Sequence, residues 1–240
     1  MGFSDRVQLA GLAAAVFVCI SVQASGDQKQ KDFRETGEFQ IYVAGTEIGS
    51  EKYAILSSGD TITSSSTLDF HNPSQRHQRI QLETKLEMNS HFVPRSYLLK
   101  SDVDGKPGTV RGEFSPNQAM FSYVGAEGPP RKSGILVGNE FTMLDTNVFH
   151  HFIFLSRLFN YDSKDKAQRF EVIIPQEEDS GFVTVRQLGM ETLTVRGKKV
   201  ETHHLQVDSG SLQIHLWVDN RRILDKISVP DRQLEVLRQQ

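Results

Sequence analysis

A regular alternation of apolar and polar residues between Met190 and Val229 is the feature that most constrains the fold of this chain. The alternation falls into four segments, METLTV, KKVETHHLQV, LQIHLWV and RILDKISV, separated by turns rich in Gly, Asp and Asn. Alternate residues of a strand point to opposite faces of a sheet, and these turn residues tolerate the positive φ that hairpins require. The segments therefore predict an antiparallel meander with one buried face. Its predicted buried positions are Leu205, Val207, Leu212, Ile214, Leu216, Val218, Ile223, Ile227 and Val229.

The sequence before this meander repeats the pattern of strands and turns. Residues 37–43 and 48–56 flank a tight turn and predict a first hairpin. A Ser/Thr-rich strand follows at 61–70, and its low apolar content favours an edge or a solvent-facing position. Pro94 predicts an edge or a bulge in a later strand, because proline has no N–H to donate to a neighbour. The tail after Pro230 fits either a last strand or one helical turn.

One segment, residues 145–161, departs from the strand pattern and carries helical spacing. The apolar side chains on its main stripe are Val148, Phe149, Phe152, Leu155 and Phe159. Asp145 or Thr146 is expected to cap its first turn. Phe154 and Leu158 fall outside the stripe, so the helix is apolar over more than one face. Such a helix must be covered, either by its own sheet or by something bound to it.

The N-terminus predicts export. Residues 1–24 read as a secretory signal peptide, with an apolar run and a small-residue cleavage site that ends at Ala24. An uncleaved anchor and lipidation at Cys19 are the alternatives. We expect a disordered leader at 25–36, then a single β-rich domain at 37–240 in a periplasmic or extracellular protein. Cleavage after Ala24 would leave no cysteine, and hence no disulfide, and no stable transmembrane span.

Charge and motifs argue against several classes of function. The net charge is −3 and no run of Lys or Arg is present, which disfavours nucleic-acid binding. No Gly-x-Ser-x-Gly motif, phosphate-binding loop or dinucleotide fingerprint occurs, so we assign no catalytic residue and no cofactor. Paired carboxylates for glycoside hydrolysis depend on the fold, which keeps a hydrolase of envelope polymer as an alternative.

Two pairs of adjacent histidines, at 150–151 and 203–204, raise the question of a metal site. Adjacent residues point in different directions on a helix or a strand, so neither pair chelates by itself. A zinc site would need one histidine from each pair and a carboxylate such as Asp145 or Glu201. The spacing does not demand this arrangement, and we expect no metal.

Trp217 shares the polar-looking face of its strand with Gln213 and His215. It either covers the outside of the sheet or lines a concave groove under the aromatic helix. In the second case the apolar lining of a ligand site is formed by Phe149, Phe152, Phe159 and Trp217.

Four short segments carry a resemblance: VAGTEIGSE at 43–51, VPRSY at 93–97, LD at 144–145 and LWVD at 216–219. Together they resemble secreted bacterial envelope β-proteins grouped as domains of unknown function. Those proteins are similar in architecture to the LolA/LolB lipoprotein carriers, in which a curved antiparallel sheet wraps around helices and holds acyl chains. The resemblance covers most of 37–229 and assigns no functional residue. This sequence differs from the carriers in having a single convincing helix.

The sequence thus predicts a mainly β fold, a single large curved antiparallel sheet or open barrel of about a dozen strands with one apolar helix packed on the concave face. We expect a non-catalytic envelope protein that binds a lipid or other apolar component between sheet and helix. The alternatives are a structural or interaction protein with an envelope partner and no small ligand, or the polymer hydrolase. A cavity beside the helix favours ligand binding, and a filled core favours the structural alternative.

Overall fold

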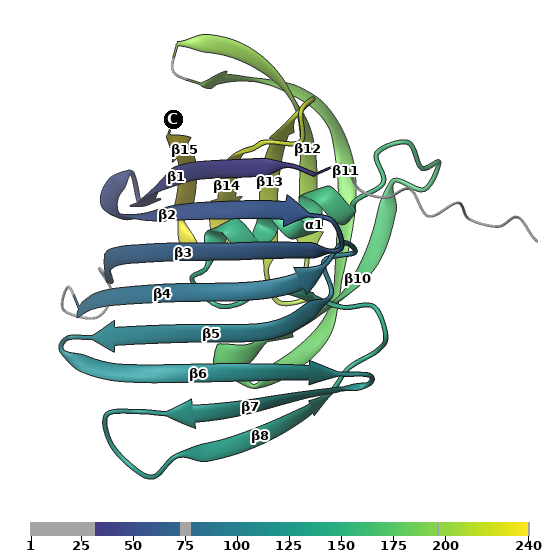
Figure 1. The fold of residues 1–240 in the computed structure, drawn as a ribbon. Helices are drawn as coiled ribbons and strands as arrows, with labels where there is room; N and C mark the ends of the chain where they lie inside the picture. Colours follow the sequence, from purple (N-terminus) through teal and green to yellow (C-terminus); the bar gives the residue numbers. More distant parts are fainter. Residues whose placement is uncertain (1–31, 73–77, 196, 240) are drawn as a thin grey trace, which may run out of the picture.

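The structure, a computed structural model, describes residues 32–72, 78–195 and 197–239. Within these residues fifteen strands form one continuous, strongly curved sheet in the order β8-β7-β6-β5-β4-β3-β2-β1-β15-β14-β13-β12-β11-β10-β9 (Figure 1). Every strand pair is antiparallel except the short pair formed by β9 and β10. The predicted mainly β fold, with one large curved antiparallel sheet, is therefore confirmed.

Two runs of strands make up this sheet. The first run is β1 (Arg34–Val43), β2 (Thr46–Ser58), β3 (Thr61–Asn72), β4 (Gln78–Asn89), β5 (Pro94–Val103), β6 (Lys106–Ser115), β7 (Gln118–Val124) and β8 (Arg131–Leu136). The second run is β9 (Thr142–Met143), β10 (Ala167–Ile174), β11 (Asp179–Val195), β12 (Lys198–Asp208), β13 (Gln213–Asp219), β14 (Leu224–Val229) and β15 (Leu234–Gln239). The helical segments are η1 (Phe149–His151), α1 (Phe152–Leu158), η2 (Pro175–Glu177) and η3 (Pro230–Arg232).

The first and last strands meet at the centre of the sheet. The chain starts at β1, proceeds strand by strand to the edge at β8, and crosses through residues 137–141 to β9 at the other edge. The segment that holds η1 and α1 connects β9 to β10. It then returns strand by strand to β15, which pairs with β1 from Glu38↔Gln239 to Val43↔Leu234. The tail contains both of the predicted alternatives, because the short helix η3 precedes the last strand.

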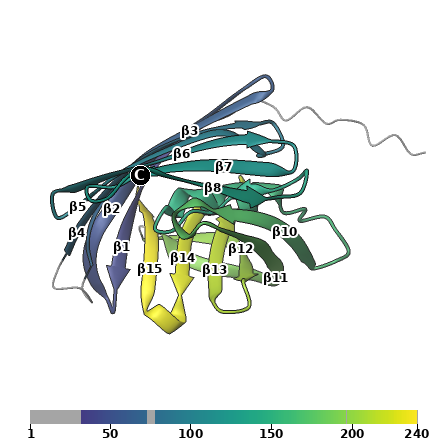
Figure 2. The ribbon, with the colours of Figure 1, turned by 90° about the horizontal axis from the view of Figure 1, so that it is seen from below.

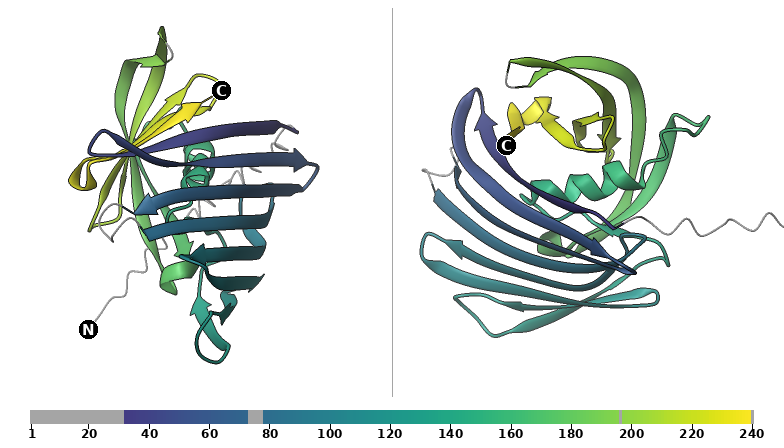
Figure 3. Two further views of the ribbon diagram at one scale, coloured as in Figure 1. Left: turned by 90° about the vertical axis from the view of Figure 1, so that its left-hand side faces the viewer. Right: turned by 45° about the horizontal axis from the view of Figure 1, so that its top comes forward.

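The two runs of strands curve around α1 and bury it between them (Figures 2 and 3). The edges of the sheet approach each other at one end. There Arg131 of β8 pairs with Glu178, and the N–H of Gly138 donates to Glu171 Oε1 of β10 at 2.9 Å. Side chains thus bridge two edges that no strand pairing closes, which gives an open, barrel-like shape.

The strand phases agree with the predicted buried face. Leu205, Val207, Leu216 and Val218 are fully buried. At the next strand the phase shifts, because Asp225 forms a bulge between the pairs Trp217↔Lys226 and Val218↔Leu224. Leu224 is consequently buried in place of Ile223, and the apolar pattern resumes at Ile227 and Val229.

Two expectations from the sequence were wrong. The Ser/Thr-rich strand β3 is not an edge strand, since it pairs with β2 on one side and β4 on the other, although the alternative of a solvent-facing position holds for its exposed residues Thr63, Ser65 and Thr67. The helical segment is also shorter than predicted: a 3₁₀ turn at 149–151 precedes seven α-helical residues, and neither has a side-chain cap. The bulge expected near Pro94 is present, because the register of β4 against β5 shifts between Glu87 and Met88.

Residues 1–31, with the predicted signal peptide and Cys19, lie outside the described residues. β1 begins at Arg34, inside the segment expected to be a disordered leader. In the described part of the chain no helix has the length and apolar character that a membrane crossing requires.

Candidate functional site

The three phenylalanines expected to line an apolar ligand site lie in the hydrophobic core around α1. Phe149 and Phe152 are 7% and 9% exposed, and Phe159 is 1% exposed. All three belong to a single cluster of buried side chains to which both runs of strands contribute. Between sheet and helix they pack against other core residues.

Trp217 lies on the opposite face of the sheet. Its neighbours along β13 are fully buried on the core side, so its indole points outward. There it stacks on His204 with ring centroids 4.5 Å apart and donates from Nε1 to Glu191 Oε2 at 2.8 Å. The structure therefore separates Trp217 from the three phenylalanines and does not bring the four together around one ligand.

A buried contact joins the helical segment to β2. Glu51 and His150 are both fully buried. Glu51 Oε2 accepts from the backbone N–H of His150 at 3.0 Å, and Oε1 lies 2.7 Å from the ring Nδ1. An ionised Glu51 requires the proton on Nδ1. The ring also stacks on Tyr53 at 5.8 Å, so its position is fixed by three contacts.

Asp145, the expected helix cap, instead connects three elements. Its Oδ2 accepts from the hydroxyl of Tyr97 at 2.6 Å, and its Oδ1 accepts from the backbone N–H groups of Thr146 and Gln176 at 2.9 and 3.0 Å. Its own N–H donates to Nδ1 of His151 at 3.1 Å, which places the proton of that ring on Nε2. Burial raises the pKa of Asp145 and lowers the pKa of His151 well below its usual range, so His151 is neutral.

A third polar contact holds the far end of α1. Glu35 of β1 accepts from Arg157 Nη2 at 2.6 Å and from Arg238 Nη1 at 2.7 Å. The hydroxyl of Tyr53 donates to the same carboxylate at 3.1 Å, and burial next to Glu35 raises the pKa of this tyrosine. These contacts tie β1, β2, β15 and the helix together. All three polar clusters lie inside the protein, where they position α1.

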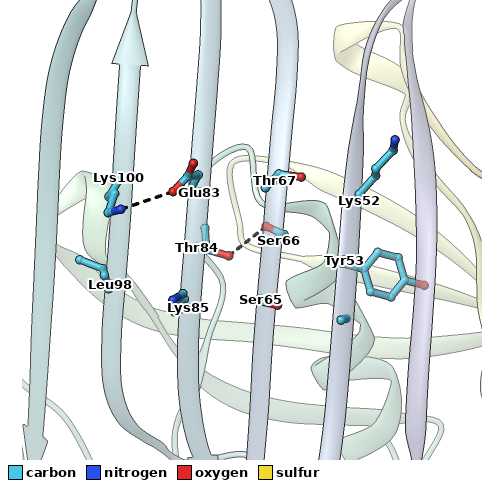
Figure 4. Close-up of a pocket in the computed structure, with 11 residues that line it drawn as sticks. Lys52, Tyr53, Ser65, Ser66, Thr67, Glu83, Thr84, Lys85, Leu98 and Lys100 are labelled. Carbon is cyan, nitrogen blue, oxygen red and sulfur yellow. Dashed lines mark hydrogen bonds and ion pairs between the residues drawn. The ribbon is translucent and has the colours of Figure 1, made fainter.

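Three adjoining hollows lie on the outer face of β1–β6, the face directed away from α1. Their volumes are about 440, 550 and 810 Å³, within the range of ligand sites. Figure 4 shows the first of them, which crosses β2, β3, β4 and β5 and is called the central hollow below. The residues of the central hollow whose side chains face outward are Lys52, Ala54, Ser65, Thr67, Glu83, Lys85, Leu98 and Lys100.

Differences in side-chain length account for the central hollow. The outward side chains of β3 at this level are Ser65 and Thr67, which are short. Lys52 on β2 and Lys85 on β4 are long and lie on either side of them. The low apolar content of β3 is thus compatible with a central position in the sheet, because its outward side forms a floor of hydroxyl groups.

The central hollow is electropositive. Three lysines and one glutamate line it, and Lys100 is paired with Glu83 at 3.5 Å. Lys52 and Lys85 have no ion-pair partner among the residues that the structure describes. The single aromatic residue of the lining, Tyr53, is 4% exposed and belongs to the inner face. The outer surface of the central hollow therefore offers ammonium and hydroxyl groups.

The two histidine pairs do not combine into the zinc site considered above. His150 and His151 are buried beside α1, whereas His203 packs against Tyr161 with ring centroids 4.6 Å apart. His204 is on the outer face with Trp217. Across the described ranges no group of three or more His, Cys, Asp or Glu side chains is arranged to hold a metal ion.

Comparison with known proteins shows which solved structures have a similar fold. No family model matches the sequence, and no curated protein matches it. Among solved structures the chain is similar to a β-barrel-like protein of domain of unknown function DUF1849 from Brucella abortus, with a TM-score of 0.56 and 10% identity over 87% of this chain and 94% of that chain. A DUF1089 family protein from Pseudomonas aeruginosa gives a TM-score of 0.47 and 10% identity over 72% and 86% of the two chains. The first of these matches confirms the likeness to a β-protein of unknown function at the level of fold.

Sequence reasoning missed the central hollow and the polar contacts of α1. A signal for the hollow was present, since the outward residues Thr63, Ser65 and Thr67 of β3 are short and hydroxyl-bearing while both neighbouring strands carry lysines. No comparable signal indicates the contact of Glu51 with His150, because 99 residues separate the two.

Proposed function

We propose that this chain is a non-catalytic interaction protein of the bacterial envelope whose central hollow binds an extended, acidic segment of a partner protein. The observation that carries the proposal is the placement of Lys52 and Lys85, which have no ion-pair partner in the described part of the chain, on either side of a floor of hydroxyl groups. Carboxylates of a partner would pair with these two ammonium groups. Complementary charge of this kind steers association and selects partners.

The lining favours a peptide over a sugar or an acyl chain. Sugars and apolar ligands use aromatic or continuous apolar surface, and here the outward side chains are mainly hydroxyl-bearing or charged. Ser65 and Thr67 can donate to backbone carbonyls of a segment that lies along β3. The predicted signal peptide and the resemblance to secreted bacterial β-proteins support an envelope location.

Binding of an apolar ligand between sheet and helix stays a prediction that needs its own measurement. The packing of Phe149, Phe152 and Phe159 in the core supports the interaction protein over the ligand carrier. Native mass spectrometry of the protein purified from an exporting bacterium, with organic extraction, separates the two. A lipid bound in near-stoichiometric amount would favour the carrier, and a bare chain would favour the interaction protein.

The peptide-binding proposal is tested by fluorescence anisotropy. The probe is a labelled peptide rich in Glu and Thr, and the matching peptide rich in Gln and Thr is the control ligand. The first variant carries Lys52→Gln and Lys85→Gln. The control variant carries Lys198→Gln and Lys199→Gln, which removes two exposed lysines of β12 outside the hollow.

We expect the first variant to bind the acidic peptide about 5- to 30-fold more weakly than the unmodified protein, because two exposed ion pairs are lost and each contributes about 0.5–1 kcal/mol. Higher salt should reduce the difference. The control variant should bind as the unmodified protein does. Equal binding of both peptides, or equal weakening in both variants, would refute a role for the central hollow.

A further inference from the structure

A second group of side chains, unrelated to the central hollow, lies on the outer face of β11–β14. His204 Nδ1 is 2.6 Å from Glu191 Oε1, and His204 Nε2 is 2.7 Å from His215 Nδ1. Trp217 stacks on His204 with an angle of 12° between the rings and donates to the second oxygen of Glu191. Three strands thus place one carboxylate and two imidazoles in a row.

A bulge in β11 creates this row. Up to Gln187 the odd-numbered residues of β11 face the core, since Val185 pairs with Val207 and both are fully buried. The register then shifts so that Gly189 pairs with His204. One extra residue reverses which face each later side chain occupies, and this brings Glu191 to the outer face.

The position of the proton on His204 leaves a lone pair on this ring that is directed at the imidazole of His215. The carboxylate of Glu191 accepts from His204 Nδ1–H, so Nε2 of the neutral ring carries a lone pair. Nδ1 of His215 meets this lone pair at hydrogen-bond distance. In the tautomer with its proton on Nε2, His215 also directs a lone pair at the same point. Two imidazole lone pairs that converge on one point are a chelating arrangement for a divalent metal ion.

We propose that His204 and His215 form a surface site for a divalent transition-metal ion of the Cu(II), Ni(II) or Zn(II) type, with Glu191 orienting His204. Imidazole suits these metals, and Cu(II) binds such ligands most tightly in the series. A carboxylate that accepts from the second nitrogen of a ligating histidine fixes its tautomer and raises its basicity. Glu191 occupies that position, and Trp217 Nε1–H donates to its other oxygen at 2.8 Å, which fixes the orientation of the carboxylate.

The geometry needs a small adjustment to admit a metal. Metal–nitrogen bonds of roughly 2.0–2.1 Å at a tetrahedral angle separate two ligand atoms by roughly 3.3 Å. The nitrogens of His204 and His215 would therefore move apart by about half an ångström, which ring rotation allows. The nearby ammonium of Lys226 is paired with Glu235. Water would complete the coordination, so two protein ligands suffice and no third side chain is required.

The single tryptophan of the chain reports on this site directly. Trp217 contacts His204, so Cu(II) bound there should quench its fluorescence. Tag-free protein is titrated with Cu(II), and Zn(II) binding is followed by calorimetry. The ligand variant is His215→Gln, and Glu191→Gln tests the orienting carboxylate. The control is His203→Gln, which alters the adjacent residue on the inner face next to Tyr161.

We expect saturable quenching at one equivalent of Cu(II) in the unmodified protein and in His203→Gln. His215→Gln should lose the saturable phase, and Glu191→Gln should bind about 10-fold more weakly. Circular dichroism confirms that each variant is folded. Electron paramagnetic resonance of the Cu(II) complex should show two nitrogen ligands. Unchanged quenching in His215→Gln, or no saturable quenching in the unmodified protein, would overturn the proposal.

Discussion

The contact between Glu51 and His150 should be among the strongest single contacts between the helical segment and the sheet. Replacing Glu51 tests whether this contact holds the helical segment in place. In Glu51→Ala the backbone N–H and the Nδ1–H of His150 both lose their acceptor. Both residues are fully buried, so water does not replace the carboxylate. Each orphaned donor costs about 1–3 kcal/mol, and loss of one partner of a buried pair typically costs about 3–5 kcal/mol.

The assay is urea unfolding followed by far-UV circular dichroism and by the fluorescence of Trp217. With a slope of about 2–3 kcal/mol per molar urea, Glu51→Ala should lower the midpoint by about 1–2 M. Glu51→Gln keeps one acceptor and should cost less, about 1–3 kcal/mol, which preserves the test where the alanine variant does not fold.

A double-mutant cycle isolates the pair. Glu51→Leu combined with His150→Phe removes both partners and keeps the ring contacts with Tyr53 and Phe154. Only the backbone N–H of residue 150 then lacks an acceptor, so the double variant should lose less stability than the two single variants added together. Additive losses, or a Glu51→Ala variant within about 1 kcal/mol of the unmodified protein, would show that this contact does not hold the helix.

Three further predictions concern pH, packing and the junction between the two runs of strands. His151→Asn keeps an acceptor for the N–H of Asp145. Because the pKa of His151 is lowered in the folded state, the stability that the neutral ring contributes is present above its ordinary pKa of about 6.5 and is lost as pH falls. In urea titrations the unmodified protein should therefore lose more unfolding free energy than the variant between pH 7 and pH 5. Gly49→Ala should destabilise by about 1–3 kcal/mol in thermal unfolding, since its Cβ would lie 2.2 Å from the carbonyl oxygen of Asp69, whereas Gly181→Ala meets no atom within 4 Å and should be neutral. Deletion of residues 234–240 should leave β1 unpaired on one side and produce oligomers in size-exclusion chromatography. A monomeric product with an unchanged melting temperature would contradict the role of β15 in joining the two runs of strands.

The strands could be predicted because the alternation of apolar and polar residues is visible within the sequence of each strand. In β12 and β13 the apolar residues occupy alternate positions, and the structure buries those positions. The hairpin of β1 and β2 follows from local turn chemistry in the same way. The pairing of β15 with β1 was not predictable, because it joins the two ends of the described chain and no local pattern encodes it.

The helix illustrates how tertiary contacts override a local pattern. Its spacing predicted a helix over 145–161, but Asp145 is engaged by Tyr97 and by the backbone of Gln176, and α1 itself spans only Phe152–Leu158. A carboxylate used in this way does not cap a first turn. The sequence contained the residues of the contact, but not the information that β5 and η2 would meet them.

The face of the sheet that Trp217 occupies could have been predicted from the sequence. Strand alternation assigns Trp217 to the face opposite Leu216 and Val218, and an apolar helix packs against the apolar face. A tryptophan on the polar face could therefore not line a site beneath that helix.

The bulge in β11 could not be predicted from the sequence, because nothing in the local pattern requires an extra residue before Gly189. Since this bulge brings Glu191 beside His204, the proposed metal site depends on a backbone irregularity that only the structure reveals, and the same is true of the hollow floored by β3. Both candidate binding surfaces thus lie on outward faces, while the inward face is committed to holding α1.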